Sequence, residues 1–77
     1  MALIRSLEPG KGTGRSPQSE VDATFTVVDD PVRGKIVKIT TYGSDVRKSE
    51  PKPSQVIELD AVMARKLISI LEEQLGI

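Results

Sequence analysis

Apolar and polar residues alternate along two stretches in the first half of the chain. Residues 23 to 28 and residues 35 to 42 both follow a period of two, which is typical of strands that bury one face. Between them lie Pro31, which presets its own φ, and Gly34, which tolerates the positive φ of tight loops. The pattern therefore predicts a turn over residues 29 to 34 and an antiparallel hairpin.

The last third of the chain predicts a short strand followed by one helix. Residues 55 to 59 form the strand, and Asp60 is a good N-cap because its carboxylate can accept a hydrogen bond from the first helical turn. From residue 61 to residue 75 apolar side chains recur at spacings of one, three and four, which predicts an amphipathic helix ending at Gly76. The apolar positions are Met63, Ala64, Leu67, Ile70, Leu71 and Leu75.

The N-terminal part of the chain is less regular. Residues 1 to 20 are predicted to be a flexible segment, because residues 9 to 17 contain glycine, proline and polar side chains with no apolar residue to bury. Residues 2 to 7 can form a short strand that docks on the body of the protein, or simply an ordered end. The folded domain is expected to span residues 21 to 77, with a β-β-β-α order.

These elements define an α+β fold class: an antiparallel sheet of three to four strands followed by one C-terminal amphipathic helix packed on one face. One helix can cover only one face of a sheet, so the other face should meet water, a partner or a ligand. Period two assigns to that open face Thr24, Thr26, Lys38, Thr40 and Tyr42. Phe25 is expected in the core.

Composition narrows the classes of function. The 77 residues include no histidine and no cysteine, so thiolate nucleophiles, imidazole bases and the usual zinc sites are excluded. We therefore expect that the protein is not an enzyme and that it binds neither a cofactor nor a metal ion. The lack of cysteine also favours a reducing, intracellular setting, in the cytoplasm, nucleoid or nucleus, and no apolar run approaches the ~20 residues of a transmembrane helix.

Charge is unevenly distributed along the chain, although eleven basic and eleven acidic residues balance overall. Residues 31 to 54 hold six cations and two anions, while the segments on either side each carry two more anions than cations. Such a basic band attracts polyanions locally even on a neutral molecule. The alternative is a set of ordinary solvated cations on loops and an exposed strand.

The stretch from Arg33 to Ile39, read as Arg-Gly-Lys-Ile-Val-Lys-Ile, is followed by Tyr42, a Lys52-Pro53 pair, Val-Ile-Glu-Leu-Asp over residues 56 to 60 and an amphipathic helix. This order resembles the single-stranded DNA-binding domain of the positive cofactor four family of transcriptional coactivators over residues 23 to 75. The resemblance implies four antiparallel strands and a helix, a homodimer formed largely through the helices, and single-stranded DNA held by basic and aromatic side chains.

Two functional hypotheses follow. The first is a nucleic-acid-binding protein, with single-stranded DNA as the partner, a homodimer through the C-terminal helix and no membrane association. Its candidate binding residues are Arg33, Lys35, Lys38, Tyr42, Arg47, Lys48 and Lys52. The second is a protein-interaction module that uses the open sheet face or edge. Its support is the lack of a stacking platform, since the chain has only two aromatic residues.

Overall fold

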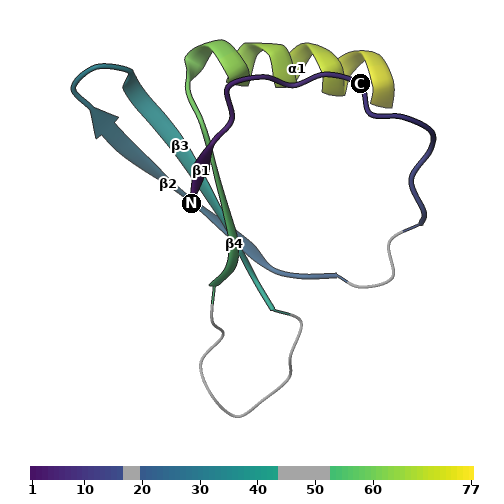
Figure 1. Cartoon of the computed structure of the whole chain (residues 1–77), viewed down its shortest axis with the longest axis horizontal. Coiled ribbons are helices and arrows are strands. Elements are labelled where there is room, and N and C mark those ends of the chain that lie inside the picture. The colour runs from purple at the N-terminus through teal and green to yellow at the C-terminus, as the bar shows by residue number, and fades with distance from the viewer. Residues whose placement is uncertain (17–19, 44–52) are drawn as a thin grey trace.

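The computed structural model describes residues 1–16, 20–43 and 53–77. It shows a four-stranded sheet and a C-terminal helix, so the predicted α+β class is confirmed (Figure 1). In chain order the elements are β1 (Ala2–Leu3), β2 (Ala23–Asp30), β3 (Gly34–Tyr42), β4 (Pro53–Leu59) and α1 (Ala61–Leu75). In space the strands follow the order β1-β4-β3-β2.

The β2–β3 hairpin forms as the alternating pattern predicted, and β2 continues two residues further than expected. Strand pairing runs from Ala23 opposite Thr41 to Asp30 opposite Gly34. Gly34 adopts a φ of 81°, the left-handed region that favours glycine. Asp30 closes the turn, because its Oδ1 accepts hydrogen bonds of 2.8 Å from the backbone N–H groups of both Val32 and Arg33.

β4 pairs antiparallel with β3 and is two residues longer at its start than predicted. The register shifts between Thr41 and Tyr42, so that Tyr42 lies opposite Pro53. A proline is compatible with this place because it is the first residue of the strand. Beside the shift, the hydroxyl groups of Thr41 and Ser54 lie 3.0 Å apart and form a hydrogen bond.

β1 corrects the predicted sheet, which is mixed rather than fully antiparallel. Ala2 and Leu3 pair parallel with Ile57 and Glu58, on the outer edge of β4. The backbone N–H of Ile4 continues this ladder by donating to the carbonyl oxygen of Glu58 at 2.9 Å. The parallel direction is possible because the long stretch of chain from residue 4 to residue 52 joins β1 to β4, whereas a tight turn can join only antiparallel neighbours.

The helix begins and ends at the predicted residues. Asp60 is the N-cap, and its Oδ1 accepts a 3.0 Å hydrogen bond from the backbone N–H of Met63. Gly76 ends α1 with a φ of 67° and donates its backbone N–H to the carbonyl oxygen of Glu72 at 3.0 Å. Both ends of the helix therefore have partners for backbone groups that would otherwise be unpaired.

α1 lies at the end of the sheet where β4 runs into it (Figure 1). Among the strands its contacts are chiefly with β4, and none of its residues is buried. Within the described residues the buried side chains are Ile36 and Leu59 alone, and both lie near this end of the sheet because Leu59 pairs with Val37. The helix was predicted to cover one face of the sheet, but it covers only the end of the sheet.

The N-cap is directly testable. Replacing Asp60 by alanine removes the acceptor for the Met63 N–H, and we expect a loss of about 1 kcal/mol in the free energy of unfolding, measured by urea denaturation. The matched control Asp60→Ser restores a capping oxygen and should recover most of that loss. Equal destabilisation by both substitutions would contradict the capping role.

Candidate functional site

The strand register divides the sheet residues between two faces of different chemistry. The polar face carries Thr24, Thr26, Lys38, Thr40, Tyr42 and Glu58, together with three apolar side chains, Val28, Val56 and the buried Ile36. The apolar face carries Phe25, Val27, Val37, Ile39, Ile57 and the buried Leu59, with the polar pairs Asp29–Lys35 and Thr41–Gln55 at its two ends. The predicted grouping of the threonines with Lys38 and Tyr42 is confirmed.

The polar face is tied together by its own side chains. The hydroxyl groups of Thr24 and Tyr42 lie 3.1 Å apart and form a hydrogen bond across the hairpin. Lys38 lies between Thr26 on β2 and Glu58 on β4, its register partners. Lys38 and Tyr42 are both half-buried. The one tyrosine of the chain is thus engaged with a threonine, and the one lysine of this face lies beside a carboxylate.

The other described candidates for nucleic-acid binding lie elsewhere. Arg33 is in the β2–β3 turn, where its Nη1 is 3.8 Å from Oδ2 of Asp30. Lys35 is exposed, opposite Asp29, on the side of the sheet away from Lys38. The structure therefore brings Lys38 and Tyr42 together and separates them from Lys35 and Arg33. Three further candidates lie outside the described residues: Arg47, Lys48 and Lys52.

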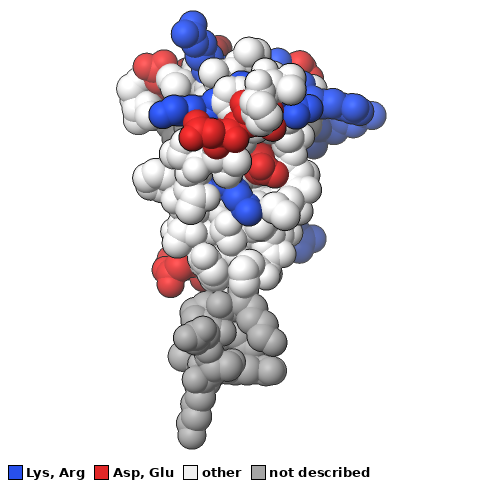
Figure 2. All heavy atoms as spheres, turned by 90° about the vertical axis from the view of Figure 1, so that its left-hand side faces the viewer, with Lys and Arg blue, Asp and Glu red and all other residues white. Residues whose placement is uncertain are grey.

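Acidic side chains accompany these cations. Arg33, Lys35 and Lys38 neighbour Asp30, Asp29 and Glu58 respectively, through the turn or the strand register. Figure 2 shows the result on one side of the molecule, where basic and acidic groups lie side by side toward one end and uncharged atoms cover most of the middle. This mixing weakens the local field that a purely basic patch would project.

The turn also perturbs the acid that closes it. Hydrogen bonds from the backbone N–H groups of Arg33 and Val32 lower the pKa of the Asp30 carboxyl, with a smaller contribution from the Arg33 charge. Both kinds of interaction favour the ionised form. The charge of Asp30 is therefore part of how the turn is held.

The apolar face is the feature that sequence reasoning missed. Phe25, expected in the core, has 74% of its surface exposed, and Val27 and Ile57 are 55% and 41% exposed. Val37 and Ile39 lie between them and are half-buried. The exposure of Phe25, where burial was predicted, has a local cause. Because Asp60 is the one residue between β4 and α1, the helix is held at the end of the strand. Alternation in both strands identified this face but did not show whether the helix reaches it.

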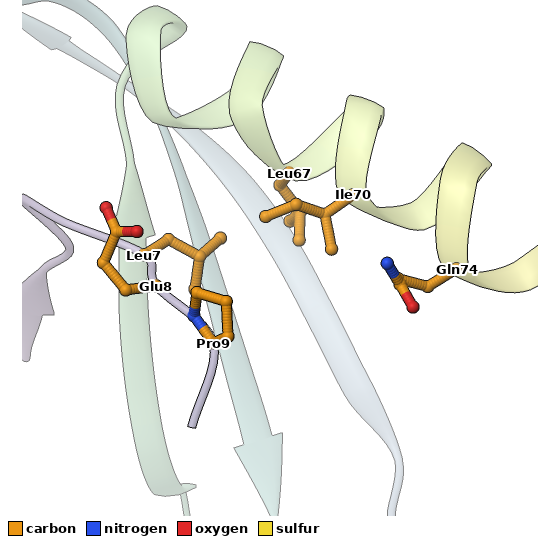
Figure 3. A pocket seen from close by; sticks show the side chains of 6 residues that line it. All are labelled: Leu7, Glu8, Pro9, Leu67, Ile70 and Gln74. Carbon is orange, nitrogen blue, oxygen red and sulfur yellow. The ribbon is translucent and has the colours of Figure 1, made fainter. Parts of the chain in front are cut away.

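A hollow of about 370 Å³ lies between α1 and the N-terminal segment. Leu67 and Ile70 of the helix point toward Leu7 and Pro9 (Figure 3). The Nζ of Lys66 donates a 2.8 Å hydrogen bond to Oε1 of Glu8 and so ties the two segments together. This side of the helix thus faces the N-terminal segment across the hollow.

Two further features were sought in the described residues. In residues 1–16, 20–43 and 53–77, no helix is long and apolar enough to cross a membrane. In the same part of the chain, no three acidic side chains come together as metal ligands would. No family model, curated protein or solved structure matches this chain.

The Asp30 turn makes a pH-dependent prediction. The Asp30 carboxyl has a lower pKa in the folded protein than in the unfolded chain, where an Asp titrates at about 3.9. Its ionised form therefore stabilises the fold above the unfolded pKa, and this stabilisation is lost as the pH falls through the folded pKa. Asp30→Asn keeps an acceptor for the turn but cannot titrate. We expect the wild type to lose more stability than this variant between about pH 6 and about pH 3, measured by urea midpoints.

The neighbouring substitution Asp29→Asn leaves the hydrogen bonds of the Asp30 carboxylate in place and is the matched control. It should follow the wild-type acid dependence more closely than Asp30→Asn does. Identical acid dependence in the wild type and Asp30→Asn would contradict the role assigned to the Asp30 charge.

Proposed function

We propose that this chain is a protein-interaction module whose apolar face binds the surface of another polypeptide. The observation that carries the proposal is the exposure of Phe25, Val27 and Ile57 on one continuous sheet face. Burying a side chain of this kind contributes about 1.5–3 kcal/mol, so leaving several in water is costly. Contiguous apolar patches on folded proteins mark interaction surfaces.

The chemistry of the face favours a polypeptide partner over a nucleic acid. Phe25 is the one phenylalanine of the chain, and its neighbours Val27, Ile39 and Ile57 are aliphatic. Aliphatic side chains offer neither phosphate contacts nor ring stacking, whereas an aromatic anchor among aliphatic neighbours suits the apolar core of a protein interface.

Nucleic-acid binding is a second candidate, supported by a separate observation. Residues 31 to 54 carry six cations against two anions, and Lys38 shares the polar face with Tyr42. On this hypothesis a single strand crosses the polar face beside Lys38 and Tyr42. Because only one ring is available for stacking, phosphate contacts would carry most of the affinity.

Photocrosslinking tests the apolar face. A photoreactive phenylalanine analogue is placed at residue 25 or, as the matched control, at residue 26, its neighbour on the opposite face. We expect irradiation of cells to give protein adducts from residue 25 in clear excess over residue 26, because only the former lies within the proposed interface. Equal or absent protein adducts at residue 25 would overturn the proposal.

Salt-dependent binding tests the second candidate. On that hypothesis, a labelled single-stranded oligonucleotide binds at low salt in an anisotropy titration, and Lys38→Gln with Lys48→Gln reduces the slope of log affinity against log salt by about 0.7 for each lost contact. Lys11→Gln, an exposed lysine outside residues 31 to 54, is the control and should leave the slope nearly unchanged. No binding at tens of micromolar protein would rule this candidate out.

A further inference from the structure

β2 forms an outer edge of the sheet, and within residues 1–16, 20–43 and 53–77 no strand pairs with its outer side. The other edge of the sheet is covered, because β1 pairs with β4 there and the backbone N–H of Ile4 extends that pairing to Glu58. An edge strand without a neighbour presents a row of backbone N–H and carbonyl groups to which another chain can pair. The open edge of the described sheet is therefore β2.

β2 also lacks the features that usually protect an edge strand. It is eight residues long and pairs with β3 in a continuous register from Ala23 to Asp30. Residues 23 to 28 include neither a proline nor a charged residue. Edge strands are commonly protected by short length, by lysine or proline, or by a bulge. The edge of β2 can therefore accept a further strand.

The ladder with β3 shows which backbone groups of β2 face outward. The N–H of Tyr42 donates to the carbonyl oxygen of Asp22 at 3.0 Å, so the backbone groups of Asp22 point toward β3. In an antiparallel ladder such pairs alternate with pairs whose backbone groups point away from the neighbouring strand. The residues whose backbone groups face the open edge are therefore Ala23, Phe25, Val27 and Asp29.

Two of these outward-facing residues also belong to the apolar face. The side chains of Phe25 and Val27 are exposed there. A strand that pairs with β2 places every second side chain on this same face, directly beside these two. In peptide recognition by strand addition, the backbone pairing supplies affinity and the alternate side chains supply specificity. One extended segment could therefore pair with the edge and cover part of the apolar face.

The start of β2 is acidic. Residues 20 to 30 hold four acidic residues and no basic one. The two acids at the end of β2 have the basic neighbours already described, whereas Glu20 and Asp22, at its start, are exposed. Asp22 lies opposite the uncharged Tyr42. A basic residue of an added strand beside Asp22 would form a cross-strand pair of opposite charge.

We propose that β2 binds an extended segment of another protein as a fifth, antiparallel strand of the sheet. The segment carries apolar residues opposite Val27, Phe25 and Ala23, and a basic residue at its C-terminal end, opposite Asp22. The antiparallel direction continues the arrangement of β2 and β3 and is the more stable pairing per residue. This inference rests on the proposed function, since it gives the conformation and chemistry of the polypeptide that the apolar face binds.

A synthetic peptide tests the backbone pairing on the unaltered protein. Its sequence is Val-Thr-Val-Thr-Val-Lys-Lys, it carries an N-terminal fluorescent label, and its binding is measured by anisotropy. In the proposed register the N–H groups of the valines point toward β2 and those of the threonines point away. We expect N-methylation of the central valine to raise the dissociation constant at least about tenfold, because a hydrogen bond is lost. N-methylation of a threonine is the matched control and should leave it within about threefold.

The edge can also be blocked from the side of the protein. Val27→Pro removes an outward N–H group while leaving the ladder with β3 complete, a position that proline tolerates in edge strands. Val27→Ala is the matched control, because it shortens the same side chain but keeps the N–H. We expect Val27→Pro to weaken peptide binding at least about tenfold more than Val27→Ala does. Equal effects would contradict backbone pairing at β2, and the N-methylated peptides provide the same test without altering the protein.

The outcomes separate this inference from the proposed function. Selective loss of binding with the N-methylated valine supports the added strand, whereas a larger loss with the N-methylated threonine overturns the antiparallel arrangement. Equally tight binding of both methylated peptides overturns the added strand, while the apolar face stands as a binding surface. A lack of binding at about 1 mM peptide, when residue 25 photocrosslinks to protein in cells, has the same meaning.

Two further results would count against the proposal. No peptide binding together with no protein adduct at residue 25 overturns both this inference and the proposed function. A wild-type chain that forms a dimer in sedimentation, which Val27→Pro dissociates, assigns the edge of β2 to a second copy and overturns the proposed partner.

Discussion

The shortage of apolar cover is the constraint on which the arrangement of this protein depends. A four-stranded sheet has two faces, and the chain offers one helix to cover them. Because Asp60 alone joins β4 to that helix, the helix stays at the strand end, where its Leu67 and Ile70 face the N-terminal segment. Phe25 and Val27 are left in water as a direct result. The exposure of this sheet face therefore results from strand connectivity rather than from charge.

Charge acquires a different meaning once the strands are paired. Along the sequence Lys35 and Lys38 belong to a basic band, whereas across the sheet they lie opposite Asp29 and Glu58. Opposite charges at paired positions of neighbouring strands favour that strand register, which is consistent with a role for these lysines in the sheet itself. A count along the chain cannot detect such neighbours, because they belong to other strands.

Features set by a few adjacent residues could be predicted, and those that depend on distant residues could not. Asp60 and Gly76 delimit the helix through local hydrogen bonds, and Gly34 marks the turn through its own backbone preference. The face shared by Lys38 and Tyr42 follows from period two. The direction of β1 depends on pairing with the distant β4. The exposure of Phe25 depends on where the helix lies relative to β2, a strand distant from it in the sequence.

The pairing of β1 with β4 has a consequence for the order in which the protein folds. Ala2 meets Ile57, whereas the two strands of the hairpin are joined by a short turn. Closing the longer loop costs more chain entropy, and distant contacts form more slowly than local ones. During synthesis β1 leaves the ribosome before β4 exists, so the hairpin can assemble while β1 still waits for its partner. The N-terminal strand is made before the other elements but is joined to the sheet after the hairpin.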